Sequence, residues 1–185
     1  MIEKERIAEK ERREMYEQYN FLMEIIKKEG THIIGMQSIR CKHHVNTDYI
    51  VTNSIEEDDF KIEFINLSYP LMNNYIPSLE YSLEQNYNTN NEEASYHVKM
   101  KFICVKDEDR RKGIGSALIN HFKAYIKDMS ITFGSKTTHI SGSLPRYSDE
   151  KEVSELKDFY IRNGFEYIPS NDHKTNGYIK YTFDI

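Results

Sequence analysis

Hydrophobic and polar residues alternate along most of the chain between residues 31 and 105. This period of two predicts strands with one buried face. We predict five strands here: His32–Arg40, Asp48–Asn53, Phe60–Leu67, Leu79–Glu84 and Tyr96–Cys104. The last two form a hairpin whose polar face sets Glu80 and Glu84 against Lys99 and Lys101. The run 103–105 is apolar on both faces, which is typical of a central strand.

A helical pattern precedes these strands and predicts a helix over residues 2–29, ended by Gly30. Its first half is almost entirely charged, whereas its second half carries an apolar stripe at Met15, Tyr19, Leu22 and Ile26. The helix is either a solvated extension or a docking or dimerisation helix, and the sequence does not decide between them. We therefore expect an N-terminal extension at 1–30 and one domain at 31–185.

A second helical stripe begins at Ile114, with Asn120, Lys123 and Lys127 on the opposite, polar side. The remaining predicted elements are a strand at Thr137–Leu144, a helix at Asp149–Asn163, and strands at Phe165–Ile168 and Tyr178–Ile185. Together these patterns predict an α/β protein of the α+β type, with a mixed, mostly antiparallel sheet flanked by helices.

Composition narrows the function classes. The formal net charge of -5 over 185 residues argues against a broad nucleic-acid surface. No run of about 18 apolar residues predicts a membrane span, and the charged N-terminus does not resemble a secretion signal. Cys41 and Cys104 are far apart in sequence, so we expect no disulfide scaffold and a cytoplasmic location.

The stretch 105–118 joins the central strand to the second helix through a charged turn. We call residues 110–116 the cradle; they are Arg110, Arg111, Lys112, Gly113, Ile114, Gly115 and Ser116. The first N–H groups of a helix lack partners and carry partial positive charge. The two glycines let an anion approach this backbone closely, and the three basic side chains add charge. The cradle is therefore a candidate phosphate or pyrophosphate site, with an ordinary charged turn as the alternative.

Other kinds of site are less well supported. Cys41, His43 and His44 resemble part of a metal site, but no second ligand pair at a suitable spacing accompanies them, so we expect no metal. No sharp strand-to-helix turn carries a nucleophile with a base nearby. The nucleotide-loop motif G-x-x-x-x-G-K-[ST] and the dinucleotide motif G-x-G-x-x-G are both absent.

What remains is R-x-x-G-x-G, formed by Arg110, Gly113 and Gly115 after a strand that ends near Val105. A strand and a helix follow, and this helix closes in Tyr160-x-x-x-Gly164-Phe165. These features resemble the GNAT superfamily of acetyl-CoA-dependent N-acetyltransferases, over roughly residues 78–185. The resemblance implies a sheet that is splayed at its centre and a bound acetyl-CoA.

The resemblance also implies roles for individual residues. Arg110 and the backbone N–H groups across residues 111–116 would hold the pyrophosphate of acetyl-CoA. The strand edge at Ile103 and Val105 would pair with the pantetheine arm, and an N–H near Ile103 would polarise the acetyl carbonyl. Tyr160 matches the tyrosine that protonates the departing thiolate, although core packing is the alternative role for this side chain.

The acceptor side is less well specified. Glu80, His97, Ser141 and Ser143 are candidates for substrate binding, and each has solvated strand polarity as its alternative. The two helices that usually wall the acceptor site after the first strand of the family are missing from the predicted element order. The base that takes the proton of the acceptor is therefore not assigned.

We expect transfer of an acetyl group from acetyl-CoA to a primary amine, by direct attack in a ternary complex and without a membrane or a nucleic acid as partner. The alternative is a non-catalytic acyl-CoA-binding module whose N-terminal helix docks a partner. The N-terminal helix or a sheet edge is also a candidate surface for a homodimer.

Overall fold

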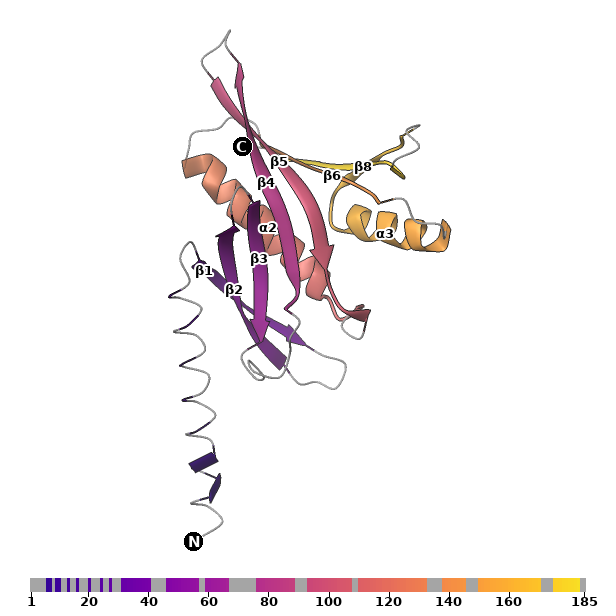
Figure 1. The fold of residues 1–185 in the computed structure, drawn as a ribbon. Helices are drawn as coiled ribbons and strands as arrows, with labels where there is room; N and C mark the ends of the chain where they lie inside the picture. The colour runs from indigo at the N-terminus through magenta and orange to yellow at the C-terminus, as the bar shows by residue number, and fades with distance from the viewer. Residues whose placement is uncertain are drawn as a thin grey trace.

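Across the described residues of the computed structural model, eight strands form one sheet in the order β1-β2-β3-β4-β5-β6-β8-β7, and two helices pack against it (Figure 1). The structure describes residues 31–40, 46–56, 59–66, 76–88, 93–107, 110–132, 138–145, 150–170 and 175–183, with isolated positions between 6 and 27. The predicted N-terminal helix over 2–29 lies, apart from those isolated positions, outside the described residues. The division at residue 30 therefore stays a prediction.

The predicted order of the remaining elements is confirmed. The described elements are β1 (His32–Arg40), β2 (Asn46–Glu56), β3 (Asp59–Asn66), β4 (Ser78–Asn88), β5 (Glu93–Cys104), α2 (Ile114–Thr132), β6 (Thr138–Ser143), α3 (Glu150–Arg162), β7 (Glu166–Ile168) and β8 (Tyr178–Thr182). The hairpin strands β4 and β5 extend further toward their shared turn than predicted. Neither α2 nor α3 is long and apolar enough to cross a membrane, and the same holds for the rest of the described chain.

The sheet is antiparallel except for the pair β5 and β6, which run parallel at its centre. Their pairing extends from Tyr96 opposite Thr138 to Lys99 opposite Ser141, although both strands continue beyond it. Figure 1 shows β6 and β8 leaving the direction of β5. At the point of separation, a Cβ on Gly142 would lie 3.2 Å from the backbone oxygen of Met100. A glycine is therefore what lets the two strands touch just before they part.

The register of the β4–β5 hairpin differs from the predicted one because β5 contains a bulge. Glu80 faces Phe102 and Tyr81 faces Met100, so Lys101 is an extra residue. As a result, Glu84 lies opposite His97, and the predicted pairing of Glu80 and Glu84 with Lys99 and Lys101 is wrong. The ammonium of Lys101 instead binds the carboxylate of Asp59 on β3.

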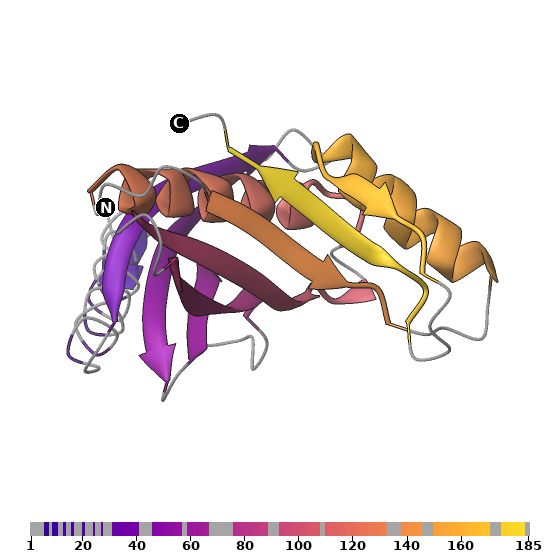
Figure 2. The same ribbon diagram turned by 90° about the horizontal axis from the view of Figure 1, so that it is seen from above.

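One face of the sheet and both helices form a continuous core. The buried apolar side chains of α2 are Ile114, Leu118, Ile119, Phe122 and Ile126, close to the predicted stripe. The ring of Phe122 lies 4.9 Å from that of Tyr81 on β4. Figure 2 shows α2 and α3 on the same side of the sheet. The other face of β4, β5 and β6, which carries Glu84, His97 and Ser141, is covered by neither helix; we call it the open face.

A polar chain crosses this core beneath α2. The hydroxyl of Tyr81 donates to Asn53 Oδ1 at 3.2 Å, and Asn53 Nδ2 donates to the hydroxyl of Tyr125 at 3.2 Å. Tyr81 is fully buried. Burial, and then the nearby Tyr125, raise the pKa of Tyr81 above its ordinary value, while the hydrogen bond to Asn53 opposes that rise. The hydroxyl therefore stays protonated and acts as a hydrogen-bond donor.

We expect Tyr81→Phe to lower the free energy of unfolding by about 1–3 kcal/mol, because it leaves a buried amide oxygen of Asn53 without its donor. Urea denaturation measures the change. Tyr178→Phe is the control: Tyr178 is 41% exposed, and we expect this variant to stay within about 0.5 kcal/mol of the wild type. Equal stability of the two variants would show that the polar chain does not contribute.

Candidate functional site

The cradle follows the end of β5 through a tight turn. The N–H of Arg110 donates to the carbonyl oxygen of Asp107 at 3.2 Å. Arg111 then adopts a φ of 63°, a left-handed conformation that is uncommon for a residue with a side chain. Its guanidinium lies 3.6 Å from the carboxylate of Glu155 on α3, in an exposed ion pair that adds little stability. The turn thus directs an arginine side chain toward α3 and opens the start of α2.

The start of α2 fits an anion. The first-turn N–H groups of a helix have no intrahelical partner. Here the N–H of Ala117 donates to Gly113 O at 2.9 Å, so the first-turn N–H groups are those that precede Ala117. No acidic residue lies in the first turn of α2 to offset the positive end of its dipole. Gly113 has a φ of 87°, and a Cβ built on it would meet nothing within 4 Å. Open space therefore lies in front of this backbone, as the phosphate interpretation requires.

The second glycine of the motif has a packing role that the sequence did not indicate. A Cβ on Gly115 would lie 3.1 Å from the ring of Phe159, which projects from α3. In this structure Gly115 therefore makes room for an aromatic side chain, whereas the prediction gave that room to an anion. The contact also joins the cradle to the helix that carries Tyr160.

The predicted pantetheine edge lies where β5 has parted from β6. Within the described residues, β5 pairs with β6 only from Tyr96 to Lys99, so Ile103 and Val105 lie beyond that pairing. On its other side, Ile103 is paired with Leu79 of β4. Both predicted residues are half-buried and pack against the core. The structure thus brings this strand edge and the cradle into one continuous segment.

Tyr160, the predicted general acid, is a core side chain in this structure. It is 5% exposed, and its ring lies 5.2 Å from that of Phe159 and 5.7 Å from that of Phe165. Packing, the alternative role that the sequence left open, is therefore present. A role in proton transfer stays a prediction.

The open face contains an arrangement that the sequence did not indicate. Ser141 Oγ and His97 Nε2 are hydrogen-bonded at 2.7 Å across β5 and β6. His97 Nδ1 lies 3.4 Å from a carboxylate oxygen of Glu84 on β4. A proton on Nδ1, facing the carboxylate, leaves Nε2 as the acceptor for the serine hydroxyl. We call these three side chains the Glu84–His97–Ser141 line; Ser141 belongs to the last pair before the strands part.

A second histidine lies beside this line. His139 is paired with His97 in the parallel register, and its Nδ1 lies 3.1 Å from the hydroxyl of Thr182 on β8. Burial, followed by the positive charges of Lys180 and His97, lowers the pKa of His139 below its ordinary value. His139 is therefore a neutral neighbour at physiological pH and adds no positive charge beside His97.

The remaining predicted residues are placed as follows. Glu80 is half-buried opposite Phe102, and Ser143 is exposed at the end of β6. Cys41, His43 and His44 lie outside the described residues. Elsewhere, across the ranges that the structure describes, no group of three or more His, Cys, Asp or Glu side chains is placed to hold a metal ion.

Residues 82–167 match the family described as "Acetyltransferase (GNAT) domain". This segment runs from β4 to β7 and contains the cradle, the Glu84–His97–Ser141 line and Tyr160. The chain contains a GNAT acetyltransferase domain. The predicted family and the predicted enzyme class are thereby confirmed.

Solved structures give distant matches. An Arabidopsis thaliana NAA60 in complex with a bisubstrate analogue is 14% identical, with a TM-score of 0.49, over 70% of this chain and 79% of that one. A mutant AtaT toxin bound to the C-terminus of the antitoxin AtaR and to acetyl-CoA is 12% identical, with a TM-score of 0.45, over 67% and 68%. The KacTA–DNA complex is 14% identical, with a TM-score of 0.45, over 69% and 70%. Similarity at this level says nothing about substrate or partner.

No curated protein matches the chain in sequence.

We expect Gly142→Ala to destabilise the GNAT domain by about 1–3 kcal/mol, because the new methyl group meets the backbone of Met100 and the side chain of Ile179, 3.3 Å away. Thermal unfolding measures this loss. Ser143→Ala, on the next residue of the same strand but exposed, is the control and should be nearly neutral. An unchanged melting temperature for Gly142→Ala would mean that the strands are not in close contact at this point.

Proposed function

We propose that the GNAT domain transfers the acetyl group of acetyl-CoA to a primary amine, by direct attack in a ternary complex. The observation that carries this proposal is the open start of α2 at Gly113, placed directly after the end of β5 where β5 has parted from β6. The anion site and the strand edge lie in one segment, so a single extended ligand with a pyrophosphate and a flexible arm fits both.

The cradle would hold the pyrophosphate through backbone N–H groups of the first turn of α2, with Arg110 and Lys112 supplying side-chain charge. The arm would then follow the edge of β5 toward Ile103 and Val105, forming strand-like hydrogen bonds. An N–H near Ile103 would stabilise the negative charge that develops on the acetyl carbonyl oxygen. These assignments follow the family resemblance and are supported by the open space at Gly113.

The open face is the side from which we expect the amine to approach. An amine attacks a thioester only when it is neutral, so a group on this face must take its proton. We assign that role to the Glu84–His97–Ser141 line: the serine hydroxyl accepts the proton of the amine and passes its own to His97 Nε2. The Glu84 carboxylate stabilises the imidazolium that forms. The line meets the point where β5 and β6 part, which places it next to the expected acetyl group.

On the other side of the parted strands, the thiolate that leaves must be protonated. Tyr160 is the candidate, since it lies on α3 beside Phe159, which contacts the cradle at Gly115. Because Tyr160 is buried, this role requires its hydroxyl to meet the sulfur from within the core.

The acceptor amine that we propose belongs to a cationic compound, because carboxylates at the hairpin, such as that of Glu84, would attract its positive charge. We propose that the reaction takes place in the cytoplasm.

The cradle is tested by calorimetric titration with acetyl-CoA. We expect micromolar binding by the wild type and at least a roughly tenfold loss in Gly113→Asp, which puts a negative charge in front of the helix start. Gly113→Asn is the matched control: asparagine has the same shape, tolerates a positive φ and carries no charge. Equal affinity of the two variants, or no binding by the wild type at millimolar ligand, would contradict the proposed cradle.

Turnover with a panel of primary amines tests the two proton-transfer assignments. We expect His97→Gln to lower kcat by roughly a hundredfold and Tyr160→Phe by a similar factor, with acetyl-CoA affinity almost unchanged in both. His139→Gln, beside His97 but outside the line, is the control and should keep its activity. Wild-type-like turnover in either variant would remove the role of that residue. Acetyl-CoA binding without turnover on any amine would instead support a non-catalytic acyl-CoA-binding module.

A further inference from the structure

Two exposed apolar side chains lie on β7 and β8, close to the point where β5 and β6 part. Tyr178 on β8 is 41% exposed and Ile168 on β7 is 43% exposed. They are directly opposite each other in the antiparallel register of these strands, and we call them the apolar pair. On its other side, Tyr178 is opposite Ser143 of β6. The apolar pair therefore continues a row that begins on β6, the strand that has separated from β5.

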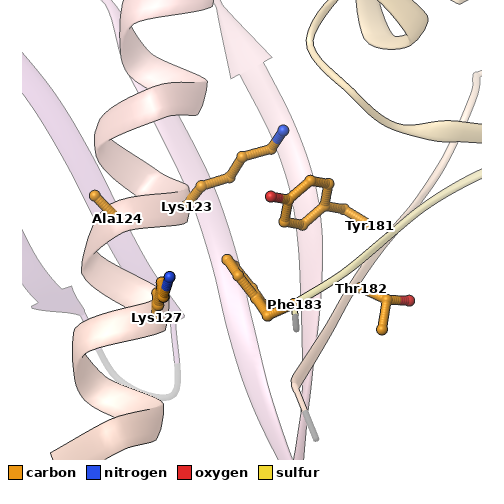
Figure 3. Close-up of a pocket in the computed structure, with 6 residues that line it drawn as sticks. All are labelled: Lys123, Ala124, Lys127, Tyr181, Thr182 and Phe183. Atoms are coloured by element: carbon orange, nitrogen blue, oxygen red, sulfur yellow. The ribbon is translucent and has the colours of Figure 1, made fainter. Parts of the chain in front are cut away.

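The alternation of side chains along β8 places Tyr178 on the open face. Figure 3 shows the pocket between α2 and the end of β8, where Tyr181 points toward α2 and Thr182 points away from it. The half-buried Lys123 of α2 covers this inner side, with its Nζ 3.7 Å from the ring centre of Tyr181 and 4.6 Å from that of Phe165. Because successive residues of a strand point to opposite faces, Tyr178 shares the outer face with Thr182.

The apolar pair lies next to the serine of the Glu84–His97–Ser141 line. Ser141 is opposite Lys180, which precedes Thr182 and follows Tyr178 on the same face of β8. Two residues along a strand correspond to about 7 Å and one strand across to about 5 Å, so the Cα atoms of Ser141 and Tyr178 are roughly 8 Å apart. A small molecule whose reacting group lies at Ser141 can therefore extend onto the apolar pair.

The charges of this region indicate what kind of group fits there. Lys180 is opposite Glu166 of β7, so the row that starts at Ser141 carries one charge of each sign and offers no net attraction for a second cation. On the other side of the line, the carboxylate of Glu84 attracts the reacting amine. A molecule that fits both sides carries one positive charge, that of the amine itself, and an uncharged apolar tail that lies toward Tyr178.

We propose that the acceptor is a primary amine with an apolar tail, and that the apolar pair binds this tail while the amine reacts beside Ser141. The inference rests on the proposed function, because it names the class of acceptor for that reaction. A tail of about five or six atoms spans the roughly 8 Å between the two positions. Burying one methylene group strengthens binding by roughly fourfold, so contact with two or three methylene groups is enough for a clear preference.

Three primary amines with the same number of non-hydrogen atoms test the proposal: hexylamine, 2-(2-aminoethoxy)ethanol and 1,5-diaminopentane. We expect kcat/KM of the full chain to be at least about tenfold higher for hexylamine than for the other two. The difference should lie mainly in KM, because a contact away from the reacting atoms stabilises ground state and transition state alike. Equal values for the three amines, or a higher value for the diamine, would overturn the inference and leave the proposed function standing.

Variants of the apolar pair show whether it is the source of the preference. Tyr178→Thr and Ile168→Thr should each reduce the ratio of kcat/KM between hexylamine and 2-(2-aminoethoxy)ethanol by at least about threefold, whereas Tyr178→Phe, which keeps the ring, should retain it. Ile161→Thr is the matched control, since Ile161 is 45% exposed but lies on α3, behind the sheet. An unchanged ratio in Tyr178→Thr would contradict the proposal.

Calorimetric titration of the same amines in the presence of CoA separates the inference from the proposed function. If no amine is turned over, tighter binding of hexylamine that Tyr178→Thr removes would support the apolar pair and contradict the transfer reaction. Equal binding without turnover would overturn both. Sedimentation velocity tests the other occupant of an exposed apolar pair, a second copy of the chain. A wild-type dimer that Tyr178→Thr converts to a monomer would overturn the inference.

Discussion

The parallel pairing of β5 with β6 is the constraint on which the rest of this fold depends. Two adjacent parallel strands cannot be joined by a tight turn, so the chain must cross over one face of the sheet before β6 begins. That crossover is α2, and it begins where β5 ends. The positive end of a helix is thereby placed near the C-terminal end of a central strand, beside the point where β5 and β6 part. The cradle is a consequence of this connection as much as of its glycines.

Elements with a clear period could be predicted from the sequence, because one buried face imposes its spacing on the residues. The strand at His32–Arg40 and the apolar stripe of α2 are examples. The bulge at Lys101 could not be predicted, because the inward-facing positions of β5 change from Val98 and Met100 to Ile103 next to a run of apolar residues, 102–105, that hides the change. It shifts the register of everything beyond it, and so the predicted carboxylate–lysine pairs were replaced by Glu84 opposite His97.

The candidate site also has one part that the sequence predicted and other parts that it did not. The R-x-x-G-x-G motif predicted the cradle because it is local and its glycines lie in a fixed relation to the start of a helix. The contact between His97 and Ser141 joins positions that are 44 residues apart, and it depends on how two strands are aligned. The setting of Lys123 depends on rings from β8 and the segment after α3. Its polar neighbours on α2 indicated solvent, and only the tertiary packing reversed that.

Gly142 determines how far along their length β5 and β6 stay in contact. Its missing side chain lets β6 touch the backbone of Met100, which holds the two strands together up to that point and no further. The region in which the strands are apart therefore begins at a defined position, and in the proposed complex the arm of the ligand would end there. A bulkier residue at position 142 would force the two strands apart earlier and lengthen the gap between them. In the proposed complex, the length of acyl chain that fits between β5 and β6 would therefore depend on the absence of a side chain at Gly142, at the end of the gap far from the cradle.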